Sequence, residues 1–105
     1  MEIQEKETIR IFHALSDTNR YRIFRMLSGG ELCACKILEK FDITQPTLSH
    51  HMKVLTECGL VTGRKDGIWM HYAINPDILS ALIGILTDVL NSPQEPSETR
   101  VCRGV

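Results

Sequence analysis

Apolar positions along this chain follow two different periods, and the change between them marks its structural elements. In residues 2–15, apolar side chains recur at three-residue steps among Glu and Lys, which predicts an amphipathic helix. Ser16-Asp17 can cap a second helix, whose apolar stripe ends at the paired glycines Gly29-Gly30. We therefore expect two helices before residue 30.

The next segment has the spacing of a helix, a tight turn and a longer helix. A short helix is predicted over residues 32–40, and the connection after it leads to Thr44, a natural N-cap. Pro46 falls in the first turn of the longer helix, where its missing N–H costs little, and Gly59 ends that helix. This pattern predicts a helix-turn-helix.

Two extended runs, residues 60–64 and 68–74, flank Lys65-Asp66-Gly67. An Asp-Gly pair between such runs indicates a β-hairpin, because both residues tolerate a positive φ. A hairpin of two strands is not stable alone, so we expect it to pack on the helices. Asn75-Pro76 is a cap followed by a first-turn proline, and it starts a last helix that runs to about residue 91.

The predicted order of elements is α-α-α-α-β-β-α, a mainly α chain with a β-hairpin. A helix-turn-helix with a hairpin directly behind its second helix defines a winged helix-turn-helix. We expect this domain to span residues 1–91. Residues 92–105 have the composition of a flexible C-terminal tail, rich in Ser, Pro and Glu and without a regular apolar period.

The longer helix, residues 44–58, has two different faces on a helical wheel. Its apolar side is made by Leu48, His51, Met52, Leu55 and Cys58. The opposite side carries small, polar and basic groups, which can hydrogen-bond to base edges in a major groove or to phosphates. An ordinary surface helix also has a polar side, but the preceding helix and the hairpin favour groove binding. The candidate DNA-binding residues are Gln45, Thr47, Ser49, His50 and Lys53 on this helix, with Arg64 and Lys65 at the hairpin tip as phosphate contacts.

The last helix is apolar over more of its surface than one packing contact needs. Its Ile, Leu and Val side chains cover an arc of about 160°, against about 100° for a single core-facing stripe. The first helix of the same chain can cover part of this surface, and a second partner can cover the rest. We expect a homodimer through the first and last helices, which would set two reading helices on an inverted repeat in double-stranded operator DNA.

Length and composition limit the remaining choices. The chain has 105 residues and a formal net charge of −1, enough for one domain with a modest core. No apolar run approaches the ~20 residues of a membrane span, and the charged N-terminus lacks a secretory signal pattern, so we expect a cytoplasmic protein with no membrane partner. The sequence contains no nucleophile–base set and no phosphate loop, so we do not expect an enzyme.

The near-neutral charge argues against a uniformly basic nucleic-acid-binding protein, but the charges are unevenly distributed. Basic side chains gather in the second helix and in residues 44–72, whereas Glu2, Glu5 and Glu7 concentrate acid at the N-terminus. We therefore expect modest non-specific affinity for DNA. Specific binding then depends on the dimer and on base contacts, and it falls steeply with salt.

Four cysteines in a chain without a secretory signal indicate reduced thiols rather than a disulfide framework. Cys33 and Cys35 form a Cys-x-Cys pair at the start of the predicted short helix, a spacing that fits neither a zinc ribbon nor a thioredoxin-like site. In a regular helix their side chains point about 200° apart, so one ion can bind both only if the first turn is distorted. Thiolates select soft ions such as As(III), Cd(II) and Pb(II), while two unliganded core thiols are the alternative.

These segments together resemble the ArsR/SmtB family of winged-helix metalloregulatory repressors. The resemblance is carried by residues 14–20, 31–35, 45–55 and 59–72, and the Glu-Leu-Cys-Ala-Cys of residues 31–35 is most similar to the arsenite-responsive branch. It implies a homodimer that represses an operon and leaves DNA when As(III) or another soft thiophilic ion binds Cys33 and Cys35. The alternative is a repressor of the same fold that responds to Cd(II) or Pb(II), or to oxidants or reactive sulfur.

The sequence departs from the arsenite-sensing pattern at one position. In that branch a third cysteine follows three residues after the second, where this chain has Leu38. Cys102 in the tail is a candidate third ligand, because it lies eleven positions after residue 91 and an extended tail spans up to ~36 Å. Two thiolates with a water or a small thiol are the other arrangement, and Cys58 is expected to be structural. No His occurs in residues 76–91, so the zinc site that other family members carry on the last helix is absent.

Overall fold

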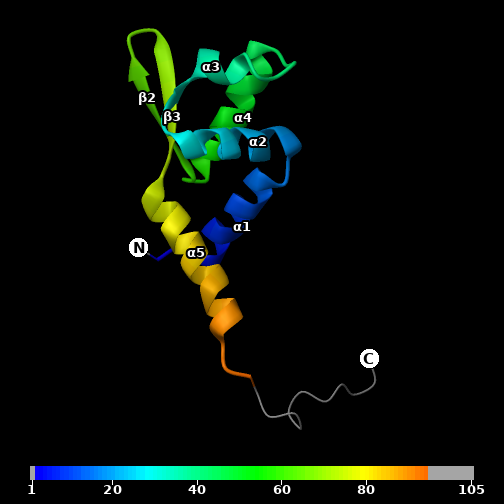
Figure 1. Cartoon of the computed structure of the whole chain (residues 1–105), viewed down its shortest axis with the longest axis vertical. Coiled ribbons are helices and arrows are strands. Elements are labelled where there is room, and N and C mark those ends of the chain that lie inside the picture. Colours follow the sequence, from blue (N-terminus) through cyan, green and yellow to red (C-terminus); the bar gives the residue numbers. More distant parts are fainter. Residues whose placement is uncertain (1, 95–105) are drawn as a thin grey trace.

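The computed structural model describes residues 2–94, and it has the predicted winged helix-turn-helix with one added strand. The elements are α1 (Glu5–Leu15), α2 (Thr18–Met26), the 3₁₀ turn η1 (Leu27–Gly29), β1 (Leu32–Cys33), α3 (Ala34–Leu38), α4 (Gln45–Glu57), β2 (Val61–Asp66), β3 (Trp69–Ile74) and α5 (Pro76–Asn91). In Figure 1, α1 and α5 lie away from the tip of the β2–β3 hairpin. Helix α2 lies between that tip and the pair of helices α1 and α5.

Helices α2, α4 and α5 begin at residues whose side chains cap them. Asp17 accepts a hydrogen bond from the backbone N–H of Arg20 at 3.1 Å, and the Thr44 hydroxyl accepts one from the N–H of Thr47 at 3.3 Å. The Asn75 side chain likewise accepts from the first turn of α5. These bonds satisfy backbone donors that a helix start leaves unpaired, and they confirm the predicted starts of α2, α4 and α5.

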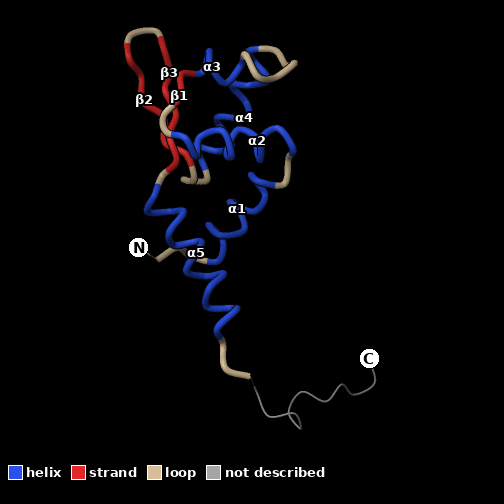
Figure 2. The backbone as a smooth tube through the Cα atoms, in the orientation of Figure 1, coloured by secondary structure: helices blue, strands red, loops and turns tan. Residues whose placement is uncertain are grey.

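The sheet has three strands in the order β1–β3–β2, and all its pairings are antiparallel (Figure 2). Residues 32–33 were predicted as the first turn of the third helix, and this prediction is wrong, because they form β1. Leu32 lies opposite Tyr72 and Cys33 lies opposite His71. The free edge of β3 offers hydrogen-bonding partners that a local sequence pattern does not reveal, so two residues pair with it before α3 begins.

The turn of the hairpin is displaced by one residue from its predicted position. Asp66 and Trp69 are the last paired residues, so the two turn residues are Gly67 and Ile68. Gly67 has a φ of 65°, and none of the described non-glycine residues has a positive φ. A glycine at the first turn position with an ordinary residue after it is the pattern of a type II′ turn. Lys65 consequently lies within β2, opposite Met70, rather than in the turn.

The core lies between α1, α2, α4 and the base of the hairpin. Its buried apolar side chains are Ile11, Ala14, Ile23, Leu27, Ile37, Leu48, Met52, Leu55, Leu60, Val61 and Leu82. The buried side of α4 is the one that the helical wheel predicts, with Cys58 half-buried at its end. This packing leaves the opposite side of α4 facing away from the protein.

The C-terminal end of α5 agrees with its predicted position. The last helix ends at Asn91, as predicted, and the expected tail falls mostly on residues 95–105, which lie outside the described part. Within residues 2–94, every helix is too short or too polar to cross a membrane.

Candidate DNA-binding surface and thiol site

The polar side of α4 is exposed to solvent over its whole length. Each of the five predicted contact residues on this helix is exposed: Gln45, Thr47, Ser49, His50 and Lys53. The Lys53 ammonium lies 3.9 Å from the Glu57 carboxylate, and both side chains are largely exposed. An exposed pair at this spacing contributes little stability, so Glu57 does not prevent Lys53 from turning to a phosphate.

The buried side chain of Arg20 forms hydrogen bonds on the core side of α4. The Arg20 Nε–H donates to the carbonyl of Ala14 at 2.8 Å, and Arg20 Nη1 donates to His51 Nδ1 at 3.2 Å. Asp17 Oδ2 lies 3.9 Å from the same ring nitrogen. The cluster therefore joins the end of α1, the start of α2 and the middle of α4. Arg20 is one of the basic side chains of the second helix, but it is only 8% exposed and so does not add to a basic surface.

The electrostatics of this cluster agree with its hydrogen bonds. The backbone N–H of Arg20 beside Asp17 holds the pKa of that carboxyl below its ordinary value. Burial lowers the pKa of His51, and the nearby Asp17 carboxylate opposes this only in part. The His51 ring is therefore neutral at neutral pH, and its Nδ1 can accept the hydrogen bond from Arg20.

The wing, which is the β2–β3 hairpin, carries an ion pair that local sequence patterns do not predict. Arg64 on β2 binds Glu31 in a two-point arrangement, with Nε to Oε2 at 3.0 Å and Nη2 to Oε1 at 2.7 Å. The hydrogen bond from Arg64 lowers the pKa of Glu31, which also lies 3.8 Å from His71 Nδ1. Only the strand register brings Glu31 near Arg64, since 33 residues separate them. Arg64 and Lys65 are both exposed, and Arg64 is held in this ion pair.

The thiols of Cys33 and Cys35 lie together at the junction of β1 and α3. Their Sγ atoms are 2.9 Å apart, with the Cys35 thiol donating to Cys33. Cys33 has extended backbone angles of φ −67° and ψ 145°, and it precedes the first residue of α3. The two side chains would point apart in a regular helix, but Cys33 lies outside the helix in extended backbone, so this restriction does not apply. The change from strand to helix at Cys33 brings both sulfurs within reach of one ion.

The two thiols differ in acidity. The hydrogen bond from Cys35 lowers the pKa of Cys33, and backbone N–H groups at the start of α3 add to this effect. The same hydrogen bond raises the pKa of Cys35, which gives up its proton less readily next to a Cys33 thiolate. Because Cys35 is exposed and Cys33 half-buried, an external ion can reach this pair of soft donors.

The other candidate ligands are placed differently. The Cys58 thiol donates to the Leu55 carbonyl at 3.3 Å, and burial raises the pKa of Cys58, which agrees with the structural role expected for it. Leu38 packs against the core. Cys102 lies outside the described residues. In the part of the chain that the structure describes, no group of three or more His, Cys, Asp or Glu side chains is placed to hold a metal ion.

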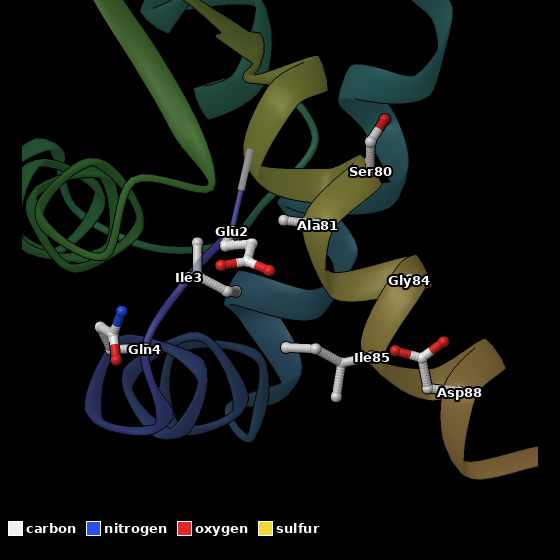
Figure 3. A pocket seen from close by; sticks show the side chains of 8 residues that line it. All are labelled: Glu2, Ile3, Gln4, Ser80, Ala81, Gly84, Ile85 and Asp88. Atoms are coloured by element: carbon white, nitrogen blue, oxygen red, sulfur yellow. The ribbon is translucent and has the colours of Figure 1, made fainter. Parts of the chain in front are cut away.

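The surface predicted for dimer formation is apolar and exposed. Its exposed apolar side chains are Ile9 and Phe12 on α1 and Ile83, Leu86, Val89 and Leu90 on α5. Beside them, the N-terminal segment and α5 line a groove of about 500 Å³. Figure 3 shows Ala81 and Ile85 of α5 pointing toward Ile3 across this groove.

Comparison with solved structures confirms the fold class as a winged helix-turn-helix. An ArsR-family transcriptional regulator superimposes with a TM-score of 0.76 at 24% identity, covering 90% of this chain and all of that one. The homodimeric winged helix-turn-helix DNA-binding domain of a possible ArsR-family regulator from Mycobacterium bovis superimposes with a TM-score of 0.65 at 25% identity. That match covers 87% of this chain and 88% of the other.

Sequence comparison identifies the family. Residues 17–62 match the family described as "Bacterial regulatory protein, arsR family". The chain is also 47% identical over 100 residues to the arsenical resistance operon repressor of Staphylococcus aureus, with 95% of this chain and 92% of that protein aligned. The chain belongs to the arsR family of bacterial transcriptional regulators, which confirms the resemblance and the expectation of a DNA-binding protein rather than an enzyme.

Proposed function

We propose that this protein represses an arsenical resistance operon and leaves its operator when As(III) binds Cys33 and Cys35. The observation that carries the proposal is the 2.9 Å separation of the two sulfurs at the start of α3, the first helix of the helix-turn-helix. Thiolates bind As(III) and other soft ions in preference to hard ones. The Staphylococcus aureus relative, which is named for arsenical resistance, supports the choice of As(III).

The proposed DNA contacts come from the exposed side of α4 and from the wing. In this proposal Gln45, Thr47, Ser49 and His50 contact base edges, and Lys53, Arg64 and Lys65 contact phosphates. Two chains associate through α1 and α5, whose exposed apolar side chains would otherwise remain in water. A two-fold dimer presents two copies of α4, which matches an inverted repeat in double-stranded operator DNA.

The position of the thiols gives the inducer a way to act on DNA binding. Cys33 ends β1 and Cys35 lies in α3, so an ion bound to both sulfurs constrains the junction between the strand and the first helix of the helix-turn-helix. A movement of α3 changes the packing behind α4. The ion needs to favour the DNA-free conformation by only a few kcal/mol, since about 1.4 kcal/mol changes an equilibrium tenfold.

As(III) can form three bonds to sulfur, and the described residues supply two thiols at this site. We propose Cys102 as the third ligand, from the same chain or from the partner. The alternative is a water molecule or a small cellular thiol in the third position. A Cys102→Ser variant tests this, because loss of a protein ligand should weaken arsenite binding and make it depend on added monothiol.

The test of the function is a gel-shift titration with the operator DNA. Wild-type protein should bind DNA and leave it when arsenite is added. Cys33→Ser and Cys35→Ser should bind the same DNA but stay bound in arsenite. Cys58→Ser is the matched control. Cys58 is also a free thiol, but it lies at the end of α4, where it donates a hydrogen bond to the Leu55 carbonyl. This variant should leave the operator in arsenite as wild type does. Normal release of the Cys33→Ser/Cys35→Ser double variant would contradict the proposal.

A redox-responsive repressor is the second candidate, and the lowered pKa of Cys33 favours it. A thiolate reacts with peroxide to give a sulfenic acid, which the neighbouring Cys35 thiol can convert to a disulfide with loss of water. Mass spectrometry after mild peroxide, beside operator release by arsenite, Cd(II) and Pb(II), separates the candidates. Release by peroxide without release by any ion would favour the redox function.

A further inference from the structure

The side chains of Glu31, Cys33, Arg64 and His71 share one region of the small sheet. Cys33 on β1 lies directly opposite His71 on β3, and His71 lies directly opposite Arg64 on β2. Residues directly opposite one another in antiparallel strands project from the same face of a sheet. Glu31, two residues before Cys33, reaches across His71 to Arg64. The thiol site and the wing therefore meet at this face.

Two hydrogen bonds join Glu31 to Arg64 across this face. Both guanidinium–carboxylate bonds are short, at 3.0 Å and 2.7 Å, so the planar groups align with two parallel hydrogen bonds. This two-point geometry restricts orientation as well as distance. A displacement of Glu31 consequently moves or releases Arg64, which carries one of the two cations predicted for the wing.

The strand on which Cys33 lies is poorly anchored. β1 has two residues, it is an edge strand, and its two pairings are to Tyr72 and His71. A short edge strand has few hydrogen bonds to resist a movement of its end. An ion that draws the sulfurs of Cys33 and Cys35 into one coordination sphere acts directly on the last residue of β1, two residues after Glu31.

We propose that Glu31 is a positioning residue that transmits occupancy of the thiols to the wing through its ion pair with Arg64. The proposal rests on the function proposed above, and it adds a route that does not pass through α3 and α4. Thiol occupancy shifts β1, the ion pair with Glu31 is rearranged, and Arg64 leaves the orientation in which it contacts a phosphate.

The test compares three variants with wild type in two assays. Glu31→Gln keeps the shape of the side chain but removes its charge. Arg64→Lys keeps the positive charge but cannot form the two-point contact. Glu39→Gln is the matched control, because Glu39 is an exposed acid directly after α3 that pairs with Lys36 at 3.8 Å instead of with Arg64. Each protein is checked for arsenite binding by titration of its free thiols.

The first assay measures operator affinity with and without arsenite, and the readout is the ratio of the two values within each variant. We expect the arsenite-induced loss of affinity to shrink at least about fivefold in Glu31→Gln and in Arg64→Lys, and to stay at the wild-type value in Glu39→Gln. The second assay uses Trp69, the single tryptophan of the chain, on the wing strand β3. Its fluorescence should change with arsenite in wild type and change less in Glu31→Gln.

The two proposals fail differently. Wild-type protein that stays on the operator in arsenite overturns the proposed function. Wild-type protein that leaves the operator, while Glu31→Gln and Arg64→Lys leave it to the same extent, overturns the role of the ion pair alone. A third outcome is that Glu31→Gln stays on the operator because arsenite no longer binds its thiols. This outcome also overturns the proposal, because Glu31 would then act on arsenite binding rather than on its transmission to the wing.

Discussion

Arg20 and His51 lie 31 residues apart in the sequence, yet Arg20 Nη1 is 3.2 Å from His51 Nδ1 in the interior of the protein. The same arginine binds the carbonyl of Ala14 near the end of α1. The helix proposed to read DNA is therefore tied by hydrogen bonds to the helix proposed to form the dimer. This contact fixes the relative position of the two functional surfaces in one subunit.

Replacement of Arg20 should destabilise the protein strongly. Arg20→Met keeps the apolar stem but leaves the Ala14 carbonyl and the His51 ring without their donor, at a cost of about 2–4 kcal/mol in the free energy of unfolding. Urea denaturation measures the difference. Arg22→Met is the control, because Arg22 is an exposed arginine on the same helix, and it should stay within about 0.5 kcal/mol of wild type. Equal stability of the two variants would contradict this role.

Protonation of His51 should weaken the fold as the solution becomes mildly acidic. Burial lowers the pKa of His51 in the folded protein, so the unfolded chain binds this proton first. The free energy of unfolding therefore falls as the pH falls from about 6.5, the ordinary value for histidine, toward the lower folded value. A His51→Gln variant lacks this proton, and its urea midpoint should change less between pH 7.5 and pH 5.5 than that of wild type. Parallel pH curves would contradict the prediction.

Cys33 should react faster than Cys35 with an alkylating agent. The hydrogen bond from Cys35 lowers the pKa of Cys33, so at neutral pH a larger fraction of Cys33 is thiolate, the reactive form. Iodoacetamide labelling followed by peptide mass spectrometry measures each rate. Cys35→Ala removes the donor, so it should raise the pKa of Cys33 and slow its labelling. Cys58 is the internal reference for a slow thiol, since burial raises its pKa. Faster labelling of Cys35 would contradict the assignment.

A charge on the exposed apolar side of α5 should prevent dimer formation. Leu86 is 51% exposed in a single chain, and burial of such side chains between two chains is the main favourable term in association. Leu86→Lys should shift the protein to monomer in sedimentation experiments and lower operator affinity about tenfold or more, because two linked half-sites become independent. Thr87→Lys, an exposed polar position on the same helix, is the control. A dimeric Leu86→Lys protein would place the interface elsewhere.

The sequence by itself determined the elements whose signals are local. Helix starts at Asp17, Thr44 and Asn75 follow from side chains that bond to the next turn of the chain. The two sides of α4 follow from the period of its apolar residues, because a helix of that length must bury one stripe. The motifs of the helix-turn-helix and the Cys-x-Cys pair were also enough to predict the family, which sequence comparison confirmed.

Only the tertiary structure decided what depends on partners that are distant in the chain. Residues 32–33 form a strand because the edge of β3 lies beside them, and this pairing takes Cys33 out of the helix and brings its sulfur to that of Cys35. Arg64 binds Glu31, and Arg20 binds His51, across 33 and 31 residues. Local periodicity reports which side of an element is buried, but the strand register and the packing of helices decide which polar side chains meet.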